Sequence, residues 1–252
     1  AKAADATSHG GNERIKAGQQ FTDNAASSID ASGGTSGGDG GRVAISAPQM
    51  GSLFSRIVAA ATGGSRGGEL VIDPLDIAIN SSGTATPGSG TINAGDPPSG
   101  TLAFRPSAFS SFSQIQLQAT RDITVTTAWN LANSADPTST LRLQAGRNIS
   151  LGANITAGNN WSVELIAGSN FTTPDPANYA AAVNRGVGSI GLAANSAVQL
   201  QNGHLLMLAG LNISISSGAA RTVAGGSIDA MAVAGDVNTG NNRTGFSFSR
   251  LG

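Results

Sequence analysis

The 252-residue sequence contains no cysteine, and only 12% of its residues are charged and 4% aromatic. The absence of cysteine excludes a disulfide scaffold, a cysteine nucleophile and thiolate metal ligands. The 14 Lys and Arg nearly balance the 15 Asp and Glu. Since the chain has no strongly basic stretch, we expect no nucleic-acid partner. With so few rings, the core must be narrow and built from small and branched aliphatic side chains.

Long apolar runs are also missing. No stretch approaches the roughly 18 apolar residues that a membrane-spanning helix requires, so we expect no membrane span. The first residues, AKAADATSHGG, lack the apolar centre of a signal peptide. We therefore expect a fragment of a longer chain, or a mature product. Glycine is abundant, but 39% of the residues are hydrophobic and regularly patterned, which indicates a folded protein.

A short phrase recurs along the chain. AGRNI at 145–149 returns as AGSNF at 167–171, each time after an alternating apolar run. Aligning the small residue after every such run gives ten anchors, mostly 21–26 residues apart: Ala17, Ala47, Asp73, Ala94, Ala119, Ala145, Ala167, Ala193, Ala209 and Ala234. Internal repeats of this length are typical of solenoid architectures.

The alternation within each repeat indicates strands. In LRLQA, Leu141, Leu143 and Ala145 alternate with polar residues, a pattern of half-buried strands. A propeller would need repeats of about 40–45 residues, and a sandwich would not repeat a phrase. We therefore predict one all-β domain over 1–252, a β-solenoid of about ten turns stacked about 4.8 Å apart. Ala145 should then lie beside Ala167, and Ile149 beside Phe171.

A polar residue recurs three positions after most anchors, where the chain turns a corner. In a solenoid these side chains would stack and satisfy backbone groups in the corner of the next turn. The plainer alternative is that Asn and Asp are common in turns. We predict a structural ladder with these members: Gln20, Asp76, Asp122, Asn148, Asn170 and Asn212.

Two segments interrupt the repeat and are expected to protrude from the rod, namely 51–68 and 173–188. The second one, TPDPANYAAAVNRGVG, reads as a helix. Asp175 would cap it, Pro176 would begin it and Gly186 would end it. Such inserts commonly carry the contacts of a repeat protein with its partners.

The phrase LxLxAGxNIxLxANITAG at 141–158 resembles the repeats of filamentous haemagglutinin-like exoproteins, the β-helical adhesins of the two-partner secretion route. The similarity is strongest over 141–172 and weaker over 113–127, 189–217 and 226–240, and the segment 31–48, ASGGTSGGDGGRVAISAP, is also similar to such proteins. The Asn-Pro motifs of the family's secretion domain do not occur here. The resemblance implies a single-stranded, right-handed parallel β-helix from the passenger rod, secreted and displayed at the bacterial surface.

Catalytic patterns are weak by comparison. A polysaccharide-cleaving β-helix would gather carboxylates on one face, for which Asp73, Asp76, Asp122 and Glu164 are the candidates. His9 and His204 lack metal-ligand spacing. We therefore predict no catalytic residues, cofactor or metal, and a non-enzymatic structural or adhesive rod. Its expected partner is a glycan or protein on a host or neighbouring cell. The alternatives are a filament subunit that self-associates end to end, and a polysaccharide-degrading enzyme.

Overall fold

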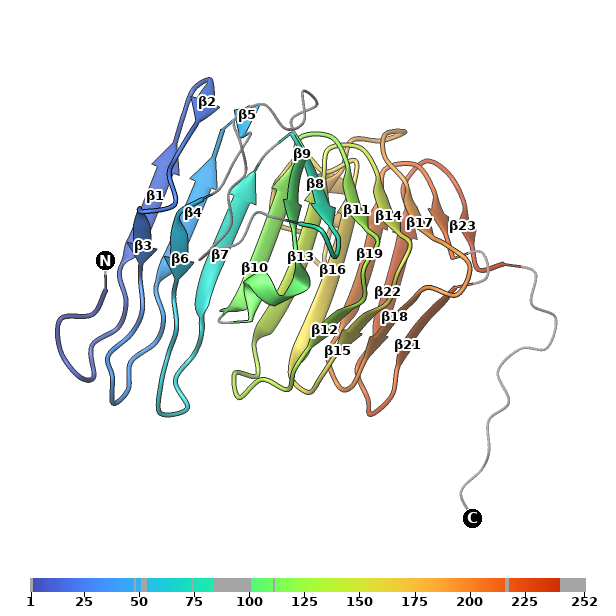
Figure 1. Ribbon diagram of the computed structural model, residues 1–252. Helices are drawn as coiled ribbons and strands as arrows, with labels where there is room; N and C mark the ends of the chain where they lie inside the picture. The colour runs from blue at the N-terminus through green and yellow to red at the C-terminus, as the bar shows by residue number, and fades with distance from the viewer. Residues whose placement is uncertain are drawn as a thin grey trace, which may run out of the picture.

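The structure of the protein is a computed structural model that describes residues 2–47, 49–50, 54–73, 75–83, 101–110, 112–215 and 218–240. The chain winds as a β-solenoid whose strands pair in parallel from turn to turn. In Figure 1 the colour therefore changes steadily from one end of the rod to the other. The predicted all-β solenoid is confirmed. Within the described ranges, no helix is long and apolar enough to cross a membrane.

One sheet, the first sheet, takes a strand from every turn. Its eight members are β1 (Asn12–Lys16), β4 (Arg42–Ser46), β7 (Gly68–Asp73), β10 (Phe112–Ala119), β13 (Ser139–Ala145), β16 (Trp161–Ala167), β19 (Leu205–Ala209) and β22 (Ile228–Ala232). The predicted pairing of Ala145 with Ala167 is present. Period-2 patterning places Leu141 and Leu143 in the core, where both are fully buried.

Two further sheets close each turn. The second sheet contains β9 (Thr101–Phe104), β8 (Asp76–Ile79), β11 (Ile123–Val125), β14 (Ile149–Leu151), β17 (Ile190–Leu192), β20 (Ile213–Ser214) and β23 (Val237–Asn238). The third sheet contains β12 (Trp129–Leu131), β15 (Ile155–Ala157), β18 (Ala197–Leu200) and β21 (Ala219–Thr222). In the first two turns, the strands of these two faces form two separate two-stranded sheets. One pairs β2 (Gln20–Phe21) with β5 (Gln49–Met50), and the other pairs β3 (Ser28–Asp30) with β6 (Arg56–Val58).

The core consists of columns of like residues along the rod axis. Matched register stacks four isoleucines of the second sheet, all fully buried: Ile123, Ile149, Ile190 and Ile213. Four alanines of the first sheet stack in the same way: Ala119, Ala145, Ala167 and Ala209. Burying each isoleucine side chain contributes about 1.5–3 kcal/mol. These columns explain how a chain with few aromatic residues fills its core.

The third turn departs from the regular pattern. After β8, the strand β9 pairs with it in the second sheet, and a short 3-10 helix, η1 (Pro106–Phe109), follows in front of the core. The ring of Phe109 lies 5.2 Å from that of Phe104 and 5.0 Å from that of Trp129. All three are almost fully buried. Three of the scarce aromatic side chains thus pack together where the described part of the third turn carries a 3-10 helix on its third face.

The described residues form about eight turns, not the ten predicted. Ala193, taken above as the anchor of a separate turn, directly follows β17 of the second sheet. The run before it, SIGLA, alternates like the strands of the first sheet, so periodicity alone did not distinguish them. Another anchor, Ala94, lies outside the described residues.

The structure describes most of the first segment that was expected to protrude and all of the second. Residues 51–53 lie outside the described range, and residues 54–68 include β6, which pairs with β3 as an ordinary strand of the second turn. Residues 173–188 leave the rod between β16 and β17. They contain only a four-residue 3-10 helix, η2 (Tyr179–Ala182), in place of the expected longer helix. Ala182 and Val183 pack on the outer face of the first sheet against Ile166, Leu206 and Leu208.

Candidate functional site

A ladder of polar side chains lines the corner between the first and second sheets. Asp76 Oδ1 accepts a hydrogen bond from the backbone N–H of Asp122, at 3.1 Å. One turn later, Asp122 Oδ1 accepts from the backbone N–H of Asn148, at 3.0 Å. Asn148 Oδ1 in turn accepts from the N–H of Ser189, also at 3.0 Å. Each side chain therefore satisfies a corner amide of the following turn, as the ladder hypothesis requires.

The ladder continues through the seventh and eighth turns. Ser189 Oγ accepts from the N–H of Asn212 at 3.3 Å, and Asn212 Oδ1 accepts from the N–H of Asp236 at 2.9 Å. The structure thus stacks four of the six predicted members and adds Ser189 and Asp236. Ser189 was missed because a serine at this place breaks the Asn/Asp pattern.

The two other predicted members lie elsewhere. Asn170 is in the excursion, where its Nδ2 donates to the carbonyl of Ala181 and its Oδ1 accepts from Thr172. Gln20 is exposed and pairs with Gln49 in the β2–β5 sheet. Ile149 consequently pairs with Ile190, and not with Phe171 as the sequence spacing predicted. The excursion displaces the second strand of the sixth turn by about twenty residues relative to a regular repeat.

Two arginines reinforce the acidic part of this corner. Arg121 binds both carboxylate oxygens of Asp76, and Arg147 binds Oδ2 of Asp122. Burial opposes ionisation of Asp122, but hydrogen bonds from Arg147 and Asn148 and the charge of Arg147 lower its pKa below the usual value. The two carboxylates are therefore occupied acceptors in a structural network.

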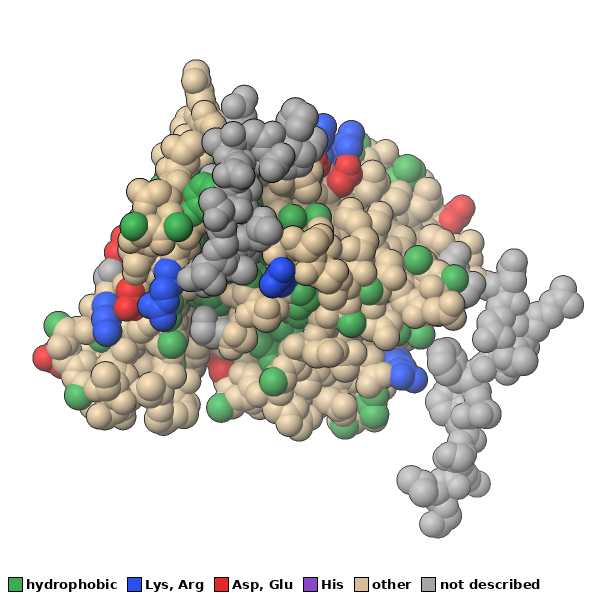
Figure 2. Space-filling view, in the orientation of Figure 1, with side chains coloured by type: hydrophobic (Ala, Val, Ile, Leu, Met, Phe, Trp, Pro, Cys, Tyr) green, Lys and Arg blue, Asp and Glu red, His purple; other side chains and the backbone are tan. Residues whose placement is uncertain are grey.

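A cavity, here called the central cleft, lies where η1 follows β9 on the third face of the third turn. It encloses about 550 Å³ and extends from Ala60 past Phe109 to Trp129. Figure 2 shows hydrophobic side chains on the floor of a hollow in the middle of this face. The hydroxyl and amide groups of its lining come from Ser65, Ser107, Ser110, Ser113, Asn130, Asn133 and Ser134. The cleft therefore combines an apolar floor with an uncharged polar lining.

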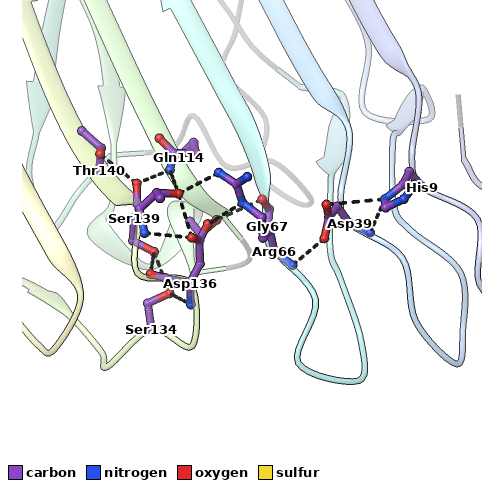
Figure 3. Close-up of polar contacts among 11 residues, drawn as sticks. His9, Asp39, Arg66, Gly67, Gln114, Ser134, Asp136, Ser139 and Thr140 are labelled. Carbon is purple, nitrogen blue, oxygen red and sulfur yellow. Dashed lines mark hydrogen bonds and ion pairs between the residues drawn. The ribbon is translucent and has the colours of Figure 1, made fainter.

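An ion pair lies beside the central cleft (Figure 3). Asp136, which is 5% exposed, receives hydrogen bonds from Arg66 Nε at 3.2 Å and from Ser113 Oγ at 3.2 Å. The backbone N–H and hydroxyl of Thr138 donate to its other oxygen. Burial opposes ionisation of Asp136, but the bonds from Thr138 and Arg66 lower its pKa. Because Arg66 precedes β7 and Asp136 precedes β13, the pair joins the third turn to the fifth.

Figure 3 shows that this contact continues toward the N-terminal end. The backbone N–H of Arg66 donates to Asp39 Oδ1 at 2.8 Å. The N–H of Asp39 donates to Nδ1 of His9 at 3.0 Å. His9 is therefore part of a chain of contacts between the loops of successive turns.

The four acids whose convergence would indicate a polysaccharide-cleaving site do not form one group. Asp76 and Asp122 lie together at the corner, each bound by an arginine. Glu164 is on the outer face of the first sheet, where Arg142 binds it. The side chain of Asp73 lies outside the described part. Among the described residues, no three His, Asp or Glu side chains form a group that could hold a metal ion.

Comparison with family models, with curated proteins and with solved structures yields no match to this chain.

Proposed function

We propose that this chain is part of a stiff, non-enzymatic rod that is displayed outside a bacterial cell and presents adhesive surfaces. The observation that carries the proposal is the continuous corner ladder, which joins every turn from the third to the eighth. Carboxylates that could serve catalysis are instead occupied by arginines in this ladder. Because the polar side chains of the corner form hydrogen bonds between successive turns, the fold is suited to a load-bearing spacer.

The proposal is tested with beads that carry the folded protein, applied to cultured epithelial cells and to bacterial cells. Beads with the folded chain should attach more than beads with the same chain unfolded by urea and blocked from refolding. In parallel, the soluble protein is incubated with plant and bacterial polysaccharides, and new reducing ends are measured. Equal attachment of both bead types would contradict adhesion. Reducing ends that increase with protein concentration would favour the enzymatic alternative.

A further inference from the structure

A second cavity lies on the outer face of the first sheet, under the excursion that joins β16 to β17. This outer cavity encloses about 350 Å³. Pro174, Pro176 and Tyr179 of the excursion form one side, and four strands of the first sheet form the other. Its volume is in the lower part of the range of small-molecule sites, about 300–1,000 Å³. The fold creates this cavity because the excursion packs back on the sheet through Ala182 and Val183.

Two rows of side chains cover the sheet side of the outer cavity. Glu164, Leu206 and Asp229 are aligned on successive strands. The neighbouring row contains hydroxyl groups and an imidazole: Thr140, Ser162, His204 and Ser227. Successive members of a row are about 4.8 Å apart, so the two carboxylates are separated by roughly 10 Å with an apolar side chain between them.

The lining of the outer cavity contains both hydrogen-bond donors and hydrogen-bond acceptors. Nδ1 of His204 is 2.6 Å from Ser227 Oγ, so the Nε2 edge of the imidazole is available to a ligand. In the described part of the chain, no hydrogen-bond partner of the Tyr179 hydroxyl is present. Burial and the charges of Asp229, Glu164 and Asp175 raise the pKa of Tyr179, so this hydroxyl keeps its proton and remains a donor. The acceptors are Asp229 and the Glu164 carboxylate, whose charge Arg142 balances.

This combination discriminates between classes of ligand. An anion would meet the carboxylates of Asp229 and Glu164, and an apolar molecule would leave polar groups unpaired. A simple cation would use the acceptors but would leave the Tyr179 hydroxyl without a partner. A neutral sugar offers donors and acceptors around its ring, and its C–H face can pack on Tyr179, Pro176 and Leu206.

We propose that the outer cavity is a binding site for a neutral sugar residue at the end of a glycan, held between Tyr179 of the excursion and Asp229 and His204 of the sheet. The site gives the proposed adhesive rod a defined ligand class, and only its biological use rests on that proposal. The sugar is bound without being cleaved.

The test measures binding of methyl glycosides of glucose, galactose, mannose, fucose and N-acetylglucosamine to the whole chain by saturation-transfer NMR and calorimetry. At least one should bind in the millimolar range, which is ordinary for a single sugar in a shallow site. Asp229→Asn and Tyr179→Phe should each weaken binding roughly three- to tenfold through loss of a hydrogen bond. Asp236→Asn, the same change on the remote corner ladder, should leave binding unaltered. Circular dichroism checks that every variant is folded.

Three results would overturn the site. One is the absence of binding by every neutral glycoside, another is equal binding by the cavity variants, and the third is a preference for lysine methyl ester or N-acetylneuraminic acid. Bead adhesion that persists while glycosides fail to bind would refute the sugar site and leave the adhesive rod standing. Loss of bead adhesion with intact glycoside binding would refute the adhesive rod and leave the sugar site standing.

Discussion

Asp122 Oδ1 accepts hydrogen bonds from both the backbone N–H and the side-chain amide of Asn148, one turn further along the rod. Asn148 repeats the arrangement by accepting from the N–H of Ser189. The Asn148 side chain therefore donates a hydrogen bond to the preceding turn, at Asp122, and accepts one from the following turn, at Ser189. Most predictions below concern this coupling between turns.

Replacing Asn148 with alanine should destabilise the fold by about 1–3 kcal/mol, because the N–H of Ser189 loses its acceptor and Asp122 loses a donor. Urea unfolding followed by circular dichroism measures the change. Asn159→Ala is the matched control, since Asn159 is exposed and its hydrogen bonds are made by the backbone. Equal destabilisation by the two variants would argue against the ladder.

The ladder should also produce a dependence of stability on pH. The folded-state pKa of Asp122 lies below its usual value, so its contribution is present above the unfolded-state pKa of about 3.9 and is lost as the pH falls through the lower folded value. Asp122→Asn should make the loss of stability in acid shallower. Arg147→Gln, which removes a partner of Asp122, should move that loss toward higher pH. Urea midpoints measured from neutral to strongly acidic pH provide the test, and two variants that follow the wild-type curve would refute it.

The core columns predict a large effect from a single truncation. Leu165 is fully buried between Leu143 and Met207 of the adjacent turns. Leu165→Ala should cost about 2–5 kcal/mol by leaving a cavity in the column. Val223→Ala is the control, since Val223 is 57% exposed and its truncation should cost little. Thermal unfolding of the two variants compares them, and a small effect at Leu165 would indicate a loosely packed core.

Two glycines of the excursion allow steric crowding to be separated from backbone strain. Both have a φ of +79°, but a Cβ on Gly188 would lie 2.1 Å from the nitrogen of Gly168, whereas one on Gly186 would meet open space. Gly186→Ala should cost about 1–2 kcal/mol from strain alone. Gly188→Ala should cost considerably more, because the excursion could no longer return to the corner ladder beside Ser189. Equal unfolding free energies for the two variants would show that the return path is adaptable.

The fold was largely predictable because period-2 patterning and a repeated corner phrase are local signals. The stacking of Ala145 on Ala167 follows directly from their spacing. The excursion was not predictable in detail, since its contacts depend on apolar outward residues such as Ile166 and Leu208, which look like core residues in the sequence. Asn170 was wrongly assigned to the ladder because the residues around it follow the same Ala-Gly-x-Asn phrase as those around Asn148.

The cavities were beyond sequence reasoning. Glu164 and Asp229 are 65 positions apart and come to line one cavity only through the register of three strands. Likewise, the contact of Arg66 with Asp136 crosses the fourth turn, and no spacing in the sequence identifies it. Such sites depend on how many residues each turn contains, which repeats of variable length do not reveal.

The axial direction of the backbone pairing has a mechanical consequence. Every strand of the first sheet is joined only to its counterparts in adjacent turns, so tension between the two ends loads those bonds in sequence and not all together. The turn nearest the pulled end unfolds first while the other turns stay folded, so the chain lengthens in discrete steps. In the adhesive rod proposed above, this order of rupture would let the chain lengthen under a sudden pull before attachment to a surface is lost.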